Sequence, residues 1–216
     1  MDEIMETTIA YRFKEGIYLN ITNRCPNLCS FCIKTKWVME FDKFNLNLQG
    51  SEPSVQEILD AAHAEIAKGP YSDIVFCGYG EPTMRVEELK AVAKVLKAEM
   101  AEGKIQQANI RLNTVGLGNL IWKRNIVPEL KDLVDIVYIS LNSPDPQQWL
   151  EIVRPAKGFE GGYDSVIEFI KASVGNFKRV VVSTVDKLGV DTAKMKELVE
   201  GLGAEFYLRV FLEEND

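Results

Sequence analysis

Three cysteines within eight residues constrain this chain more than any other feature of its sequence. Cys25, Cys29 and Cys32 have the spacing C-x3-C-x2-C and follow a strand-like run at 17–21. A tight loop that gathers three thiolates can bind three irons of a 4Fe-4S cluster, whereas clusters that only carry electrons usually have four cysteine ligands. The spacing therefore predicts a cluster with one iron open to bind and activate a ligand.

Zinc is the alternative to a cluster. A structural zinc site needs four ligands, usually in two separated pairs. The only other cysteine is Cys77, at the end of an apolar run, and the only histidine is His63, in an alanine-rich helical segment where we expect a surface or packing role. Three crowded cysteines in a chain whose acidic start does not resemble a signal peptide favour metal ligation over disulfides.

Composition and charge are those of an ordinary globular enzyme. Hydrophobic residues make up 46% of the 216 residues and charged residues 26%, which suffices for a single well-buried domain. We find no apolar run of the roughly 18 residues that a membrane span needs, and we expect a cytoplasmic protein without membrane association. A formal net charge of −7 gives no overall basic surface for generic nucleic-acid binding.

Apolar periodicity predicts alternating strands and helices. Helical spacing predicts four amphipathic helices, at about 55–66, 86–100, 163–174 and 191–201, the first opened by a capping box, Ser54-x-x-Glu57. Apolar or alternating runs predict six strands, at 17–21, 73–77, 108–113, 135–141, 179–185 and 205–211. This alternation is typical of an α/β sheet or barrel with parallel strands, and six units are two short of a complete eight-stranded barrel.

The segment 33–53 does not follow this pattern. It is rich in aromatic residues, interleaved with charged residues and asparagines. Its 21 residues are long for a connection without secondary structure, and long loops are often functional. Two interpretations stay open: a cover that buries its aromatic residues against the barrel, and a lid or docking segment.

The cysteine segment 25–32, with the aromatic Phe31 before its last cysteine, resembles the cluster loop of the radical S-adenosylmethionine (radical SAM) superfamily. The run Cys77–Pro82 resembles the G-G-E-P motif of that family, with Tyr79 in place of the first glycine. Together with R-L-N-T-V-G and I-S-L-N-S-P-D further along the chain, these motifs resemble the small TatD-associated branch of the superfamily. The likeness runs from about Tyr18 to Arg209.

This resemblance implies a fold and a chemistry. The fold is an open partial (β/α)6 barrel, with 1–216 as one radical SAM core domain. Cys25, Cys29 and Cys32 would ligate one 4Fe-4S cluster, which reductively cleaves S-adenosylmethionine to a 5'-deoxyadenosyl radical that abstracts hydrogen from an unidentified substrate. An external one-electron donor, flavodoxin or ferredoxin, is implied because the sequence has no second cysteine cluster. A TatD-type nuclease is a possible partner.

Parallel α/β sheets place their working groups at the carboxyl ends of the strands, where the polar landmarks of this sequence fall. Ser140 and Asn142 lie one residue apart and should face the same side by the strand period of two. A polar residue at a strand end can also merely cap a turn. From these positions and the resemblance together we predict contacts to S-adenosylmethionine from Phe31, Gly78, Tyr79, Gly80, Glu81, Asn113, Ser140, Asn142, Ser183 and Arg209.

No catalytic residue beyond these can be assigned from the sequence. Cys77 is most simply a small buried hydrophobe, with a redox or substrate role beside the cofactor as the alternative. Two other functions compete with a radical enzyme. One is an iron-sulfur protein for electron transfer or sensing, and the other is a partner-binding subunit that docks through the aromatic part of 33–53.

Overall fold

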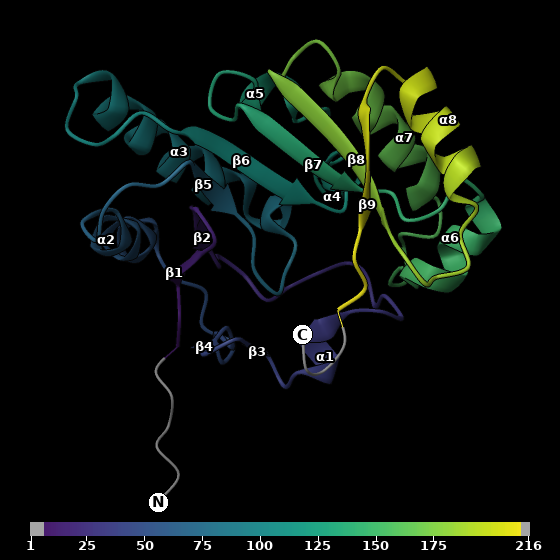
Figure 1. The fold of residues 1–216 in the computed structure, drawn as a ribbon, viewed down its shortest axis with the longest axis horizontal. Coiled ribbons are helices and arrows are strands. Elements are labelled where there is room, and N and C mark those ends of the chain that lie inside the picture. Colours follow the sequence, from purple (N-terminus) through teal and green to yellow (C-terminus); the bar gives the residue numbers. More distant parts are fainter. Residues whose placement is uncertain (1–6, 213–216) are drawn as a thin grey trace, which may run out of the picture.

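One mixed sheet forms the centre of the protein, in a computed structural model that describes residues 7–212. Its seven strands lie in the order β1-β2-β5-β6-β7-β8-β9, and all neighbours are parallel except β1, which is antiparallel to β2. The six parallel strands, with helices between most of them, confirm the predicted partial barrel (Figure 1). The bounds are β1 (Ala10–Phe13), β2 (Gly16–Leu19), β5 (Asp73–Phe76), β6 (Asn109–Thr114), β7 (Ile136–Ser140), β8 (Arg179–Val185) and β9 (Glu205–Arg209).

Helices cover the outer face of this sheet and form the main hydrophobic core with it. The chain starts them where the sequence supplies caps, for example Ser54 and Glu57, whose reciprocal bonds form the predicted capping box. Within the described residues, no helix combines the length and the apolar character needed to cross a bilayer. The helices of this layer are α2 (Val55–Ile66), the 3-10 helix η1 (Pro82–Arg85), α3 (Val86–Ala101), α4 (Gly118–Trp122), α5 (Val127–Leu130), α6 (Pro146–Val153), α7 (Gly162–Ser173) and α8 (Thr192–Gly201).

The inner, concave face of the sheet is lined by polar and aromatic side chains. In β6, Ile110 and Leu112 are buried against the helices, whereas the alternate residues face the concave side and are only half-buried. There the Arg111 guanidinium lies 5.0 Å from the ring centroid of Tyr138, 3.3 Å from the Asp73 carboxylate, and donates to the Tyr18 hydroxyl at 2.9 Å. This layer fills the barrel toward the amino ends of the strands and leaves the carboxyl ends as its mouth.

The segment 33–53 contains secondary structure that its sequence pattern does not reveal: α1 (Ile33–Lys36) and a two-stranded hairpin of β3 (Glu40–Phe41) and β4 (Phe44–Asn45). Its aromatic residues pack on β1, with the rings of Phe44 and Tyr11 4.9 Å apart. At its other side, the Lys36 ammonium lies 4.9 Å from the ring of Phe211, beyond β9. The segment therefore crosses from the first strand toward the end of the last one (Figure 1). This agrees with the cover interpretation.

Two further parts of the fold differ from the sequence prediction. Strand β1 has four residues and joins β2 through Lys14 and Glu15, a two-residue turn without the Asn-Gly or Asp-Gly signal of most tight hairpins. Helix α6 is not among the predicted helices, although its sequence carries a helix start signal. Asp145 accepts a hydrogen bond from Gln148 N as the N-cap, and Pro146 follows at the first helical position. Short elements of this kind have too few residues to show a period.

The turn after β5 requires a glycine at 80, because a Cβ there would lie 2.2 Å from the carbonyl oxygen of Thr22 and 2.8 Å from that of Arg24. We expect Gly80→Ala to lower the free energy of unfolding by about 1–3 kcal/mol, the usual range for overpacking. The matched control is Gly201→Ala, in the last turn of α8, where no described atom lies within 4 Å of an added Cβ beyond its own helix and chain neighbours.

The control should be neutral or stabilise by about 0.4–1 kcal/mol. Urea denaturation of both variants measures the difference. Equal free energies of unfolding in the two variants would mean that the turn does not approach 22–24 as closely as described.

Candidate functional site

The loop that carries the three cysteines lies across the mouth of the barrel. It leaves β2, and its backbone then bonds to the end of α6 and the residue after it: Leu28 N donates to Arg154 O at 3.0 Å and Ser30 N to Ile152 O at 2.9 Å. These bonds fix the middle of the loop between the first strand of the parallel set and the later strands. We call residues 25–32 the cluster loop.

The thiols of the cluster loop are partly buried, and none of them forms a disulfide within 7–212. Burial raises the pKa of Cys25 and of Cys29 to about 12, and for Cys25 the negative charge of Glu81 adds to the effect. Metal ligation requires thiolates, so binding would displace these protons. Three soft sulfur donors on one short loop are the donor set that an iron-sulfur cluster uses. Among the described residues, no three His, Cys, Asp or Glu side chains are placed to hold a single metal ion.

A network of polar contacts, exposed at Arg24 and buried at Arg85, fixes the base of the cluster loop. The Arg24 guanidinium binds the Glu52 carboxylate through two bonds, at 2.8 and 2.9 Å. Arg85 is buried, and its Nη1 donates to Ile21 O at 2.8 Å and to Pro53 O at 2.7 Å. The sequence analysis missed Glu52 and Arg85, because their partners are more than 25 residues away and no local pattern marks such a pair.

The glycine turn after β5 packs against the start of the same loop. A Cβ at Gly78 would lie 2.1 Å from Asn20 Oδ1, and Glu81 N donates to Arg24 O at 2.8 Å. The backbone at 78–81 is thus held beside the residues that lead into Cys25. Its contact to S-adenosylmethionine stays a prediction.

The Glu81 side chain has a structural role. It is 1% exposed, and its Oε1 accepts from Thr83 N at 3.0 Å and from the hydroxyls of Thr83 and Thr114 at 2.5 and 2.7 Å. Its Oε2 accepts from Val115 N at 2.7 Å. Both oxygens are therefore engaged in joining the ends of β5 and β6. A contact from Glu81 to a cofactor would come from its backbone.

Tyr79, at the position of the family's first glycine, joins the turn to the segment 33–53. Its hydroxyl donates to Glu40 O, and its ring is 9% exposed in a cluster with Tyr11 and Leu46. The tyrosine side chain thus anchors the β3–β4 hairpin. Nothing in the local sequence indicates this contact.

The structure brings the predicted residues of the later strands together, but not as the strand period predicts. Strand β7 ends at Ser140, and Asn142 lies beyond it with a φ of +68°, so the expectation that both continue one strand face is wrong. Asn142 N instead donates to Ser183 O at 3.1 Å. The Asn142 side chain is buried, and its Oδ1 accepts from Arg209 Nη2 at 2.9 Å.

Two buried polar atoms near this group, Asn113 Oδ1 and Arg209 Nε, have no hydrogen-bond partner among the described residues. Burial raises the pKa of the Cys77 thiol, while a hydrogen bond from the Asn113 side chain opposes the rise. Cys77 therefore has a polar neighbour and is not simply packed as a hydrophobe. Unpartnered polar atoms at the strand ends fit a site that binds a polar cofactor. Phe31, in the cluster loop, is half-buried against the core.

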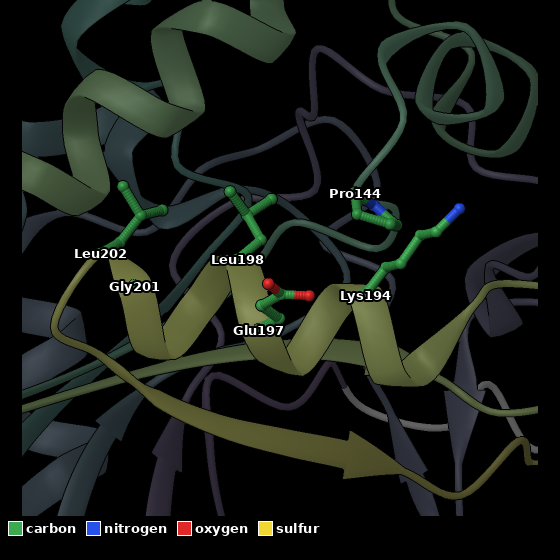
Figure 2. Close-up of a pocket in the computed structure, with 6 residues that line it drawn as sticks. All are labelled: Pro144, Lys194, Glu197, Leu198, Gly201 and Leu202. Carbon is green, nitrogen blue, oxygen red and sulfur yellow. The ribbon is translucent and has the colours of Figure 1, made fainter.

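Two surface cavities lie away from the thiols. One is a groove along α8 (Figure 2), where Leu198 and Leu202 project from the helix opposite Pro144. The other adjoins the base of the cluster loop between Arg24 and Leu48. Neither is lined by a cysteine, so neither is the candidate site.

A model of the radical SAM superfamily matches residues 19–201 of this chain. The chain therefore belongs to the radical SAM superfamily. It is 30% identical over 149 residues to a protein of Corynebacterium diphtheriae named "Probable dual-specificity RNA methyltransferase RlmN", a match that covers 68% of this chain and 38% of that protein. A protein of the same name from Phocaeicola vulgatus is 25% identical over 162 residues, covering 70% of this chain and 42% of that protein. The chain thus spans less than half of these curated relatives.

Solved structures share the fold. A structure of TYW1 with a lysine-pyruvate adduct bound has a TM-score of 0.60 at 15% identity and covers 94% of this chain and 66% of that one. HydG, described as a maturase of the [FeFe]-hydrogenase, has a TM-score of 0.64 at 11% identity and covers 93% of this chain and 43% of that one. At these identities the likeness shows the fold alone.

We expect Cys25→Ala, Cys29→Ala and Cys32→Ala each to remove most of the iron and sulfide that anaerobic reconstitution introduces, because each change deletes one of three thiolate ligands. The wild type should hold about four irons and four sulfides per chain. Cys77→Ala is the matched control and should retain both. Loss of iron from Cys77→Ala with the fold intact would indicate four-cysteine ligation, and one zinc per chain without sulfide would contradict the cluster altogether.

Glu81→Gln should lower the free energy of unfolding by about 1–3 kcal/mol, since the amide nitrogen would face backbone and hydroxyl groups that donate to the present carboxylate. Glu197→Gln, on the exposed side of α8, is the control and should change stability by less than about 0.5 kcal/mol. Urea titration at neutral pH compares the two. A Glu81→Gln variant as stable as the control would contradict the structural role of this carboxylate.

Proposed function

We propose that this radical SAM protein is an enzyme that binds one 4Fe-4S cluster through Cys25, Cys29 and Cys32 and binds S-adenosylmethionine beside it. The observation that carries the proposal is the set of three free, partly buried thiols on one loop across the mouth of a partial barrel. With both cofactors bound, reductive cleavage of S-adenosylmethionine would yield methionine and a 5'-deoxyadenosyl radical that abstracts hydrogen from the substrate.

The protein's own residues would bind and orient S-adenosylmethionine. An asparagine side chain supplies both a donor and an acceptor, which suits the ribose and the methionine groups. The turn 78–81 would offer its backbone, and Tyr79 would keep that turn attached to the hairpin. The proposed contacts are Phe31, Gly78, Tyr79, Gly80, Glu81, Asn113, Ser140, Asn142, Ser183 and Arg209.

We leave the substrate unassigned. The curated relatives are named as RNA methyltransferases, but the match covers only 38% and 42% of them. A formal net charge of −7 does not favour RNA, which is recognised mainly through basic surfaces. The proposal is therefore the generation of a radical and hydrogen abstraction, without RNA methylation.

Two finer assignments accompany this proposal. Membership of the small TatD-associated branch rests on the motifs of the sequence, and an association with a TatD-type nuclease rests on that resemblance alone. The electron would come from a flavodoxin or ferredoxin. A cytoplasmic location fits thiols that must remain reduced until the cluster assembles.

The test is product formation without substrate. The reconstituted full chain, reduced with dithionite and supplied with S-adenosylmethionine, should slowly release 5'-deoxyadenosine and methionine, whereas Cys29→Ala should release neither. Chromatography with mass detection measures both products. Wild-type protein that holds its cluster but forms no 5'-deoxyadenosine with any reductant would favour the electron-transfer alternative.

The substrate can be sought with the same assay. When deuterated cell extract is added, deuterium in the released 5'-deoxyadenosine reports hydrogen abstraction from a compound in that extract. Fractionation of the extract by this label leads to the substrate. If the 5'-deoxyadenosine released with every size fraction of the extract contained no deuterium, hydrogen abstraction would be contradicted.

A further inference from the structure

Arg209 carries a positive charge at the barrel mouth that no described acidic residue of 7–212 balances. It is the last residue of β9, and its Nη2 donates to the neutral side chain of Asn142 at 2.9 Å. Its Nε is buried without a partner, and in the part of the chain that the structure describes it makes no ion pair. Burying a charge without a counter-charge is unfavourable. The position therefore calls for a negative group that the described residues do not supply.

The other arginines of the concave face do not have this property. Arg111 is paired with Asp73 at 3.3 Å, and Arg179 with Glu205 at 2.6 Å. Lys34 is a further cation beside the cluster loop, and its ammonium donates to Asn23 O at 2.5 Å. Among the described arginines of the concave face, only Arg209 is both partly enclosed at the strand ends and without an acidic partner.

The cluster loop leads directly into α1, whose Lys36 ammonium lies 4.9 Å from the ring of Phe211, two residues beyond Arg209. Burial lowers the pKa of Arg209, and Cys29 and Cys77 oppose that effect. The backbone agrees with this proximity, because the bond from Ser30 N to Ile152 O holds the loop toward the later strands. In Figure 1 the chain between β2 and α1 crosses the end of β9 in projection. The unpaired cation and the cysteine ligands thus share one region.

We propose that Arg209 is the fixed counter-charge of the iron-sulfur cluster and raises its reduction potential. The inference rests on the proposed function. Reduction transfers one electron from a low-potential donor to the cluster and moves no proton, so the cluster and its thiolates become more negative by one charge. A nearby positive charge stabilises this reduced form more than the oxidised form. Arg209 would act on the cluster through its charge and would not contact the substrate.

Three variants separate the effect of the Arg209 charge from the effect of the shape of its side chain. Arg209→Gln removes the positive charge, Arg209→Lys keeps it, and Asn142→Asp leaves the arginine in place but sets a negative charge against its guanidinium. Lys94→Gln, on the exposed side of α3, is the control that removes one positive charge far from the cysteines. Iron and sulfide content is measured for each reconstituted full-length chain before its potential is determined.

The readout is a redox titration without S-adenosylmethionine, followed by the paramagnetic resonance signal of the reduced cluster. At a fixed potential, the ratio of reduced to oxidised cluster should fall about tenfold in Arg209→Gln and in Asn142→Asp. For a one-electron couple this is a shift of about 59 mV to more negative potential. Arg209→Lys and Lys94→Gln should titrate within about threefold of the wild type.

An unchanged midpoint in Arg209→Gln with full cluster content overturns the inference, and so does an equal shift in Lys94→Gln. Weaker binding of S-adenosylmethionine to Arg209→Gln at an unchanged midpoint would leave Arg209 only the cofactor contact proposed above and would overturn its effect on the cluster. If Arg209→Gln does not retain the cluster, the midpoint potential of Asn142→Asp is the test, and an unchanged midpoint in that variant overturns the inference. Failure of the proposed function is distinguishable, because the wild type would then hold no cluster or release no 5'-deoxyadenosine.

Discussion

The cluster loop cannot set its own geometry. Eight residues carry the three thiols that we propose as ligands of separate irons, and the loop lies between regular elements and is too short to form a core of its own. Its shape therefore depends on the elements that touch it. The end of α6 and the residue after it hold its middle through Leu28 and Ser30, and the pair Arg24–Glu52 together with Arg85 holds its base. Supporting contacts of this kind place ligands within the tolerance that a metal site requires.

The same dependence explains the side chains of the motif after β5. Glu81 uses both carboxylate oxygens to join the ends of β5 and β6, and Tyr79 joins that turn to the hairpin β3–β4. A tyrosine at this position therefore adds a structural contact that a glycine cannot make. The hairpin packs on β1 through Phe44, and α1 of the same segment contacts Phe211 through Lys36, so the turn is linked to the segment that crosses from one edge of the sheet toward the other.

What the sequence predicts well is what neighbouring residues determine. Strand 179–185 and helix 55–66 have the predicted bounds, because long periodic runs and a capping box are local signals. The cysteine spacing is local in the same way. Strand β1 pairs with its neighbour β2 across a two-residue turn that lacks the usual hairpin signal, so the local sequence does not mark it. The β3–β4 hairpin and the left-handed conformation of Asn142 could not be predicted, because each is stabilised by contacts between distant residues. The approach of Arg209 to the cluster loop joins positions about 180 residues apart, and no pattern in the sequence reports it.

The central claim is that the three thiolates of the cluster loop leave one iron free and that S-adenosylmethionine binds there. Electron-nuclear double resonance on the reduced protein with S-adenosylmethionine labelled with 15N at the methionine amino group tests it directly. The account predicts a hyperfine coupling between the cluster and the labelled nitrogen in the wild type. A fully assembled and reduced cluster that shows no coupling to the label at saturating S-adenosylmethionine would contradict it.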